Sequence, residues 1–310
     1  MTYTALTFRS GETVCDAWHF RGAGDRFASP SGRPVVVMAH GIAGTKDSGL
    51  EPFGRRLSNA GVDVVAFDYR GFGASGGEPR QTVSVARQVD DYRAAVSAVR
   101  RLPDVDPGRV LLWGVSFSGG HVLRVAANDG AIAGVIALTP LTSGAATSRL
   151  AIAQCDLVSG MRWTAAGVKG RLAAAMGGSA TFMPVVGRPG EAGALTLDGA
   201  YENYLSMAGP TWRNEIDAGV GLQLALVRSS GAAAKLRCPL LVQIADFDRF
   251  VPAESIAKVA VRGRAEVHHY PCDHFDVWPG NEWFDKVVDH QIAFIARTLA
   301  RNAAQMPSEC

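Results

Sequence analysis

The sequence lacks the features that would tie it to a membrane or to a polyanion. Its 310 residues contain no apolar stretch that approaches the roughly 20 residues needed to span a bilayer. They contain no dense run of lysine or arginine, and the formal net charge is only +2. The long-range positive field that attracts a polyanion is therefore missing. We expect no membrane span and no nucleic-acid partner.

The chain also lacks paired cysteines and a leader segment. Its five cysteines lie far apart, at positions 15, 155, 238, 272 and 310, and none forms a Cys-x-x-Cys pair. An odd, scattered set in a chain of this size indicates reduced thiols instead of a disulfide framework. Residues 1–14 are polar and alternating, without the basic start and apolar run of a signal peptide. Together these features predict a cytoplasmic protein.

Short apolar runs do recur along the chain, separated by amphipathic segments. Apolar runs of this kind are typical of strands that are buried on both faces of a parallel sheet. The segments predicted as strands are residues 3–9, 15–20, 34–39, 62–67, 110–113, 132–138, 240–244 and 265–270. Apolar residues at helical spacing predict helices over residues 49–60, 83–102 and 282–299. This alternation predicts an α/β fold with a mostly parallel eight-stranded sheet flanked by helices.

Residues 141–238 do not follow this alternation of strands and helices, because no clear strand appears in them. They include an Ala/Gly-rich, helical-looking part over residues 148–175 and a Pro/Gly-rich part over residues 183–193. A connection this long needs structure of its own. We therefore predict a helical cap, or lid, at residues 141–238, inserted into a core formed by residues 1–140 and 239–310.

The strongest local motif surrounds Ser116. A buried strand runs directly into Gly114-Val-Ser116-Phe-Ser118-Gly-Gly, and a helical run follows. A sharp strand-to-helix turn exposes such a serine and requires small residues two positions away on either side. Gly114 and Ser118 meet this requirement, although glycine is usual where Ser118 stands. We interpret Ser116 as a nucleophile; a Gly/Ser loop that merely joins strand and helix is the alternative.

A serine hydroxyl needs a base, and the base needs an orienting carboxylate. In this kind of fold the acid follows a late strand and the histidine comes after the last strand. Asp248 lies just beyond the predicted strand at residues 240–244 and is our choice of acid, with Asp246 as the second candidate. His274 lies in the loop before the final helix and is the predicted base.

A tetrahedral oxyanion needs two donors. We expect one to be the backbone N–H of Phe117, directly after the nucleophile, and the other the N–H of Ile42 in the loop that follows His40. A metal site is the competing interpretation of the cluster that includes His268 and His269. Adjacent residues on a strand face opposite sides, so these two histidines cannot chelate together, and we predict no metal and no cofactor.

Taken together, the motifs resemble those of the α/β hydrolases over nearly the whole chain. The resemblance rests on His40-Gly41, residues 68–75, the Ser116 motif, residues 248–252 and residues 273–276. It is closest to the branch of the dienelactone hydrolases and the X-Pro dipeptidyl peptidase catalytic domain. The stretch 116–122 is also similar to fungal polyketide transferases and thiohydrolases. The chain has no cysteine nucleophile and no tyrosine in the loop after His40, where the peptidases have one, so neither dienelactone nor dipeptide substrates are implied.

These observations predict a serine hydrolase that cleaves a carboxylic ester, thioester or lactone through an acyl-serine. An acyltransferase with the same three residues is the alternative, and a non-catalytic binding protein is a third option. Apolar cap residues indicate a moderately hydrophobic small-molecule acyl substrate, although ordinary packing of the cap explains them as well: Trp163, Phe182, Met183, Tyr201, Tyr204 and Trp212. The oligomeric state stays open, with a homodimer as one option.

Overall fold

The fold is built on one large sheet. The computed structural model describes residues 3–154 and 181–305 of the chain. The strands follow each other across the sheet in the order β1-β2-β4-β3-β5-β6-β9-β10. Their bounds are β1 Thr4–Ser10, β2 Thr13–Phe20, β3 Arg33–Ala39, β4 Asp63–Phe67, β5 Val105–Val115, β6 Ile132–Leu138, β9 Leu240–Ala245 and β10 Glu266–Tyr270. Strand β2 pairs antiparallel with β1 and β4, and the other pairs are parallel. The predicted mostly parallel eight-stranded sheet is confirmed.

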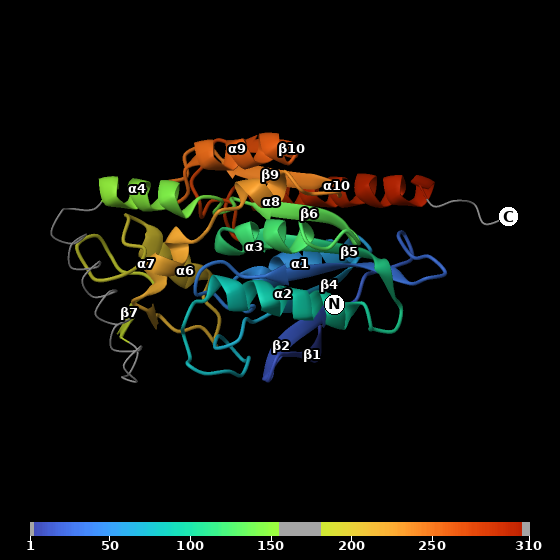
Figure 1. The fold of residues 1–310 in the computed structure, drawn as a ribbon, viewed down its shortest axis with the longest axis horizontal. Coiled ribbons are helices and arrows are strands. Elements are labelled where there is room, and N and C mark those ends of the chain that lie inside the picture. The colour runs from blue at the N-terminus through green and yellow to red at the C-terminus, as the bar shows by residue number, and fades with distance from the viewer. Residues whose placement is uncertain (1–2, 155–180, 306–310) are drawn as a thin grey trace.

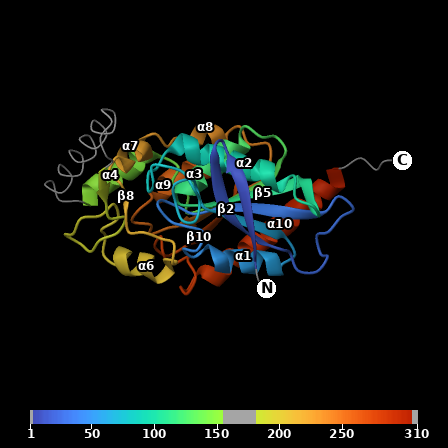
Figure 2. The same cartoon turned by 90° about the horizontal axis from the view of Figure 1, so that it is seen from below.

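Helices cover both faces of this sheet. Every residue of β4, β6 and β9 is buried, which explains why these strands appear in the sequence as continuous apolar runs. Helices α1 and α10 lie on one face, and α2, α3 and α8 lie on the other (Figure 2). Their bounds are α1 Leu50–Asn59, α2 Val85–Val99, α3 Phe117–Ala126, α8 Ser230–Ala233 and α10 Phe284–Gln305. The predicted helices over residues 49–60, 83–102 and 282–299 match α1, α2 and α10, whereas α9 (Ala253–Arg262) was not predicted.

Apart from α8, the described helices of the predicted cap region lie at one end of the molecule. Helices α4, α6 and α7 gather there with strand β7 (Figure 1). The bounds are α4 Gly144–Gln154, β7 Phe182–Met183, α6 Ala200–Met207, β8 Ile216–Asp217 and α7 Val220–Ala225. The small antiparallel pair of β7 and β8 corrects the expectation of a purely helical insertion; two-residue strands are too short to show an alternating pattern.

Part of the cap prediction lies outside the described residues. The helix expected over residues 148–175 agrees with α4 as far as Gln154, and its remainder, with Trp163, falls outside. The division into a core and a lid stays a prediction. Among the described residues no helix is long and apolar enough to cross a membrane.

A buried ion cluster ties two loops together beneath the carboxyl ends of the strands. Lys46, which is 2% exposed, places its Nζ 2.6 Å from both Asp16 Oδ1 and Asp68 Oδ2. Asp68 also accepts the backbone N–H groups of Lys46 and Ala74. Burial opposes the charge of Lys46, but the two aspartates outweigh it and raise its pKa above the ordinary value. The cluster fixes the turn over residues 68–75 against the loop that follows β3.

Replacing Lys46 with methionine should destabilise the protein strongly. The substitution keeps an unbranched side chain as far as Cε but leaves Asp68 buried without its ammonium partner. We expect the free energy of unfolding to fall by about 3–5 kcal/mol, as is typical when one partner of a buried ion pair is removed. Urea unfolding followed by circular dichroism measures the change. Lys258→Met, at an exposed helix pair, is the control and should leave stability nearly unchanged; equal effects of the two substitutions would contradict the role of the cluster.

Candidate active site

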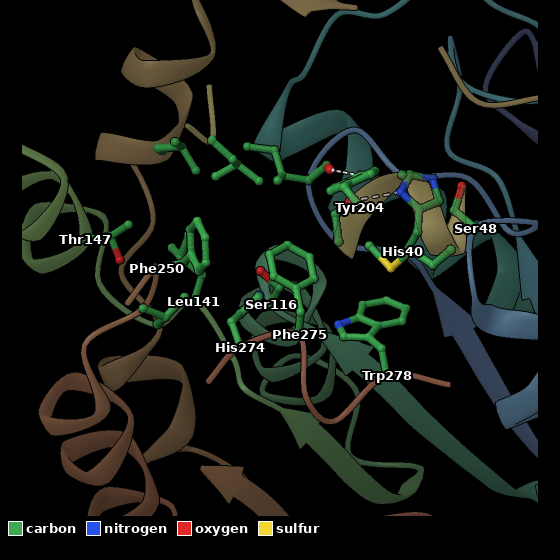
Figure 3. Close-up of a pocket in the computed structure, with 17 residues that line it drawn as sticks. His40, Ser48, Ser116, Leu141, Thr147, Tyr204, Phe250, His274, Phe275 and Trp278 are labelled. Carbon is green, nitrogen blue, oxygen red and sulfur yellow. Dashed lines mark hydrogen bonds between the residues drawn. The ribbon is translucent and has the colours of Figure 1, made fainter. Parts of the chain in front are cut away.

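Ser116 lies in a strained turn between the end of β5 and the start of α3. Its φ is 52° and its ψ is −117°, a region that residues other than glycine rarely occupy. The turn is tight, because a Cβ placed on Gly114 would lie 2.5 Å from the carbonyl oxygen of Ser118. Only glycine therefore fits at position 114. The turn presents the side chain of Ser116 to a cavity (Figure 3).

The serine that replaces the usual glycine at position 118 contributes to this turn. The Ser118 hydroxyl is buried and donates to the carbonyl oxygen of Ala39, at 2.9 Å. It also accepts the backbone N–H of Val115, at 2.8 Å. Ser118 thus connects the turn to the end of the neighbouring strand β3, and its small side chain fits without disturbing Ser116.

The structure pairs His274 with Asp248. His274 Nδ1 lies 2.6 Å from Asp248 Oδ2, and the two residues are 5% and 8% exposed. The other carboxylate oxygen, Oδ1, accepts the backbone N–H groups of Phe250 and Val251. These hydrogen bonds fix the orientation of the carboxylate, which accepts from Nδ1–H. In the neutral ring, Nε2 of His274 is then the nitrogen without a proton.

Asp246, the second candidate for the acid, has a different partner. Its Oδ1 lies 2.6 Å from Nδ1 of His269, at an exposed position. His268, on the opposite side of β10, hydrogen-bonds Glu266 instead. The two adjacent histidines thus face apart, as the strand geometry predicts. No group of three or more metal-ligating side chains converges within the described part of the chain.

The pKa of His274 is set by two opposing effects. Burial of the ring disfavours its charged form, but the charge of Asp248 and the hydrogen bond to it raise the pKa of His274 above its ordinary value. The raised pKa makes the ring a stronger proton acceptor than a free imidazole, while Asp248 fixes which nitrogen accepts.

The loop that follows β3 approaches Ser116 from the other side. A Cβ on Gly41 would lie 3.3 Å from the Cβ of Ser116. His40 Nδ1 lies 2.9 Å from the Gly41 carbonyl oxygen, and burial lowers the pKa of His40, so the ring is neutral and donates. Since the C=O and N–H of a trans peptide point in opposite directions, this bond also sets the direction of the Ile42 N–H. The Phe117 N–H stands at the start of α3, where no carbonyl of the same helix accepts it.

Two aromatic side chains of the predicted cap hold the same loop. The Tyr204 hydroxyl donates to the carbonyl oxygen of Ile42, at 2.8 Å. The Trp212 indole N–H donates to the carbonyl oxygen of Ala43, at 3.0 Å. The two rings lie 5.1 Å apart. These two side chains therefore fix successive peptide groups of the loop, a role that the sequence patterns did not predict for them.

Ser116, His274 and Ile42 all line one cavity of about 660 Å³, its mouth included (Figure 3). Its walls are mostly hydrocarbon and aromatic, from both the core and the cap: Leu141, Leu195, Tyr204, Met207, Leu224, Phe250, Val251, Phe275 and Trp278. Of the apolar cap residues singled out from the sequence, Tyr204 is the one among those described that lines this cavity. Such a lining suits an apolar organic molecule with few polar groups.

Most of these wall residues were not predicted from the sequence. Phe250 follows Asp248 by two positions, and Phe275 and Trp278 follow His274 closely. Their nearness in the sequence to the predicted acid and base is the signal that identifies them, because the loop that carries a catalytic group also borders its site. Met207 and Leu224 come from the cap, and no comparable motif marks them.

Comparison with known proteins decides the family. A family model described as serine aminopeptidase, S33, matches residues 30–272. The chain belongs to this family of α/β hydrolases. The match includes the strands β3 to β10, Ser116 and Asp248, and it ends two residues before His274.

Three relatives of this hydrolase are informative. It is 31% identical over 297 residues to the quorum-quenching protein AidA of Acinetobacter baumannii. The aligned region covers 95% of this chain and 94% of the relative. It is 32% identical to the thiohydrolase aneE of Aspergillus aculeatus over 51% of this chain and 49% of the relative. A polyketide transferase, grgF of a Penicillium species, is 33% identical over 35% of this chain and 37% of the relative. The resemblance to fungal polyketide transferases and thiohydrolases is thereby confirmed.

Solved structures agree on the fold of this hydrolase. The crystal structure of the α/β hydrolase GrgF from Penicillium superposes with a TM-score of 0.78 at 20% identity. The superposition covers 97% of this chain and all of that chain. The similarity at this identity concerns the fold and confirms the predicted α/β-hydrolase architecture.

The pairing of His274 in this hydrolase can be tested by titration. Asp248→Asn removes the charge that raises the pKa of His274 most, and it leaves burial, the largest effect, opposed by the charge of Asp273. We expect the pKa of His274 to fall below its ordinary value of about 6.5, and NMR of the imidazole nitrogens measures it. Asp246→Asn is the matched control and should leave the titration of His274 unchanged. If the pKa of His274 fell in Asp246→Asn and stayed unchanged in Asp248→Asn, the partner of His274 would be Asp246 instead of Asp248.

Proposed function

We propose that this α/β hydrolase cleaves a carboxylic ester, thioester or lactone through an acyl-serine intermediate on Ser116. One observation carries the proposal. Ser116, in its strained conformation, lines the same cavity as His274. Nδ1 of His274 lies 2.6 Å from Oδ2 of the buried Asp248. A nucleophile, a base and an orienting acid are the three parts that acyl transfer requires.

In the first half of the reaction, Ser116 Oγ attacks the carbonyl carbon of the substrate. His274 Nε2 takes the hydroxyl proton, and the charge of Asp248 stabilises the imidazolium that forms. The negative charge that develops on the carbonyl oxygen is bound by the N–H groups of Ile42 and Phe117. The C–O or C–S bond then breaks, and the leaving alcohol or thiol takes its proton from His274. Ser116 is left as an ester of the acyl group.

In the second half, water repeats these steps in place of the serine. His274 takes a proton from the water, whose oxygen attacks the acyl-serine, and the oxyanion is bound by the same two N–H groups. The bond to Ser116 Oγ breaks, Oγ regains a proton from His274, and the carboxylic acid leaves. Loss of one oxyanion donor typically costs about 10²–10³ in kcat, so the hydrogen bonds that Tyr204 and Trp212 make to the loop contribute to the rate by positioning it.

The substrate is a small molecule with a moderately hydrophobic acyl or alcohol part. The predominantly apolar cavity supports this, because it offers hydrocarbon contacts around Ser116 and few polar ones. The similarity to a quorum-quenching protein over nearly the whole chain supports a diffusible small molecule as the substrate. The partial match to a thiohydrolase keeps thioesters in the proposed class.

Transfer of the acyl group to an alcohol is the second candidate function. The partial match to a polyketide transferase favours it, as does a cavity that disfavours water. The same acyl-serine serves both reactions, and only the acceptor differs. Varying the concentration of an acceptor alcohol and measuring the ratio of free acid to transferred ester separates them: a ratio that does not respond to the acceptor supports hydrolysis.

A panel of p-nitrophenyl esters, acyl thioesters and lactones tests the proposed reaction. We expect at least one class to be turned over, and Ser116→Ala or His274→Ala to lower kcat by about 10⁴- to 10⁶-fold, as in other serine hydrolases. Asp248→Asn should lower kcat by about 10⁴-fold because the imidazole loses its orienting partner. Steady-state kinetics at pH 8 gives these values.

Two controls accompany the panel. Asp246→Asn should retain nearly the wild-type kcat, since Asp246 pairs with the exposed His269. A fluorophosphonate probe should label the wild type and not Ser116→Ala. Absence of both turnover and labelling in the wild type would overturn the proposed function.

A further inference from the structure

The indole N–H of Trp278 is buried in the cavity wall without a hydrogen-bond partner. Trp278 is 5% exposed, and its Nε1 contacts no acceptor among the described residues. The residue lines the same cavity as Ser116. Buried polar groups are almost always hydrogen-bonded, so one that lacks a partner requires an explanation.

The orientation of the ring is fixed from the opposite side. Gly49 packs so closely that a Cβ there would lie 2.9 Å from Cε3 and 3.0 Å from Cζ3 of the indole. Phe53 meets the indole edge-on, with ring centroids 6.0 Å apart. The backbone N–H of Trp278 donates to the carbonyl oxygen of Phe275. The Cε3–Cζ3 edge lies against Gly49, and the opposite edge, which carries Nε1, points to the side of Ser116 and Phe275 (Figure 3).

Two other residues of the cavity have an unpartnered buried polar atom. Neither shows as clearly as Trp278 whether its ligand must donate or accept a hydrogen bond. The Thr147 hydroxyl rotates and both donates and accepts. Nε2 of His40 belongs to a ring that already positions the loop through Nδ1. The Trp278 indole can only donate, and its direction is fixed. Its partner must therefore be an acceptor, such as the oxygen of a carbonyl or hydroxyl group.

We propose that Trp278 is a specificity-determining residue whose N–H binds a second oxygen of the acyl substrate, distinct from the carbonyl oxygen at which Ser116 reacts. The inference rests on the proposed function and refines its substrate class. The enzyme then prefers substrates that carry a ketone, amide or hydroxyl oxygen near the scissile bond over plain alkyl esters. A substrate without this oxygen leaves a buried donor unsatisfied, which a site of this kind penalises.

Matched pairs of substrates test this preference. Each pair consists of an ester with one carbonyl group at a chosen position of its acyl chain or alcohol part, and the same ester with a methylene group there. The series moves the carbonyl one position at a time. We expect wild-type kcat/KM to favour the carbonyl member of at least one pair by on the order of 10- to 100-fold.

Variants then assign the preference to the indole N–H. Trp278→Phe keeps an aromatic ring on Gly49 and removes the donor, and it should reduce the preference to within about threefold, the range of ordinary packing differences. Trp283→Phe is the matched control, because Trp283 packs on Tyr270 outside the cavity; it should keep the wild-type preference. If Trp278→Phe does not fold, 3-benzothienylalanine at position 278 retains the shape of the bicyclic ring without the N–H.

The outcomes separate the two claims. Turnover with no preference in any pair, or a preference that survives removal of the N–H, overturns the role of Trp278 while the proposed function stands. If Trp278→Phe lowers kcat/KM equally for both members of every pair, Trp278 contributes only packing, and its proposed role in specificity is also overturned. Absence of any turnover, together with no Ser116-dependent fluorophosphonate labelling, overturns the proposed function and this inference with it.

Discussion

The candidate site depends on the backbone of Ser116, which is held in a conformation that an isolated chain avoids. Both of its backbone polar groups are fixed: the N–H donates to Leu138 O, at 2.9 Å, and the carbonyl oxygen accepts from Leu141 N, at 2.7 Å. The end of β6 and the residues that follow it thus hold the backbone of Ser116, and Ser118 ties the turn to β3. Strain of this kind persists only where surrounding structure over-determines it. The core of the sheet therefore stabilises the conformation of this half-buried serine, and His274 and the loop at Gly41 are arranged around it.

The second constraint is the direct connection between the predicted cap and the loop beside Ser116. Tyr204 and Trp212 donate to carbonyl oxygens of that loop, and His40 fixes the peptide before Ile42. Burial raises the pKa of the Tyr204 hydroxyl, so it stays protonated and continues to donate at physiological pH. The predicted cap region thus takes part in the geometry proposed to bind the oxyanion, besides contributing to the cavity wall. A change in cap position would be expected to change kcat as well as substrate selection.

The core of the fold was predictable because its signal is local. Continuous apolar runs identified strands such as β6, and the small residues around Ser116 identified the strand-to-helix turn that carries it. The choice between Asp248 and Asp246 was not resolved by sequence, since both lie just beyond β9; the structure pairs Asp248 with His274 and Asp246 with His269. The contacts of the cap join residues more than a hundred positions apart, such as Tyr204 and Ile42. Periodicity cannot reveal such pairs, which is why these contacts and the orientation of the Trp278 indole emerged only from the structure.

The central claim is that Ser116 carries the acyl group during turnover. Mixing the protein with a slowly hydrolysed p-nitrophenyl ester, quenching in acid and measuring the intact mass tests it directly. We predict a transient mass increase equal to one acyl group in place of one hydrogen, located by peptide mapping to Ser116 and absent in Ser116→Ala. Turnover at the wild-type rate in Ser116→Ala, or an acyl group that maps to another residue, would contradict it.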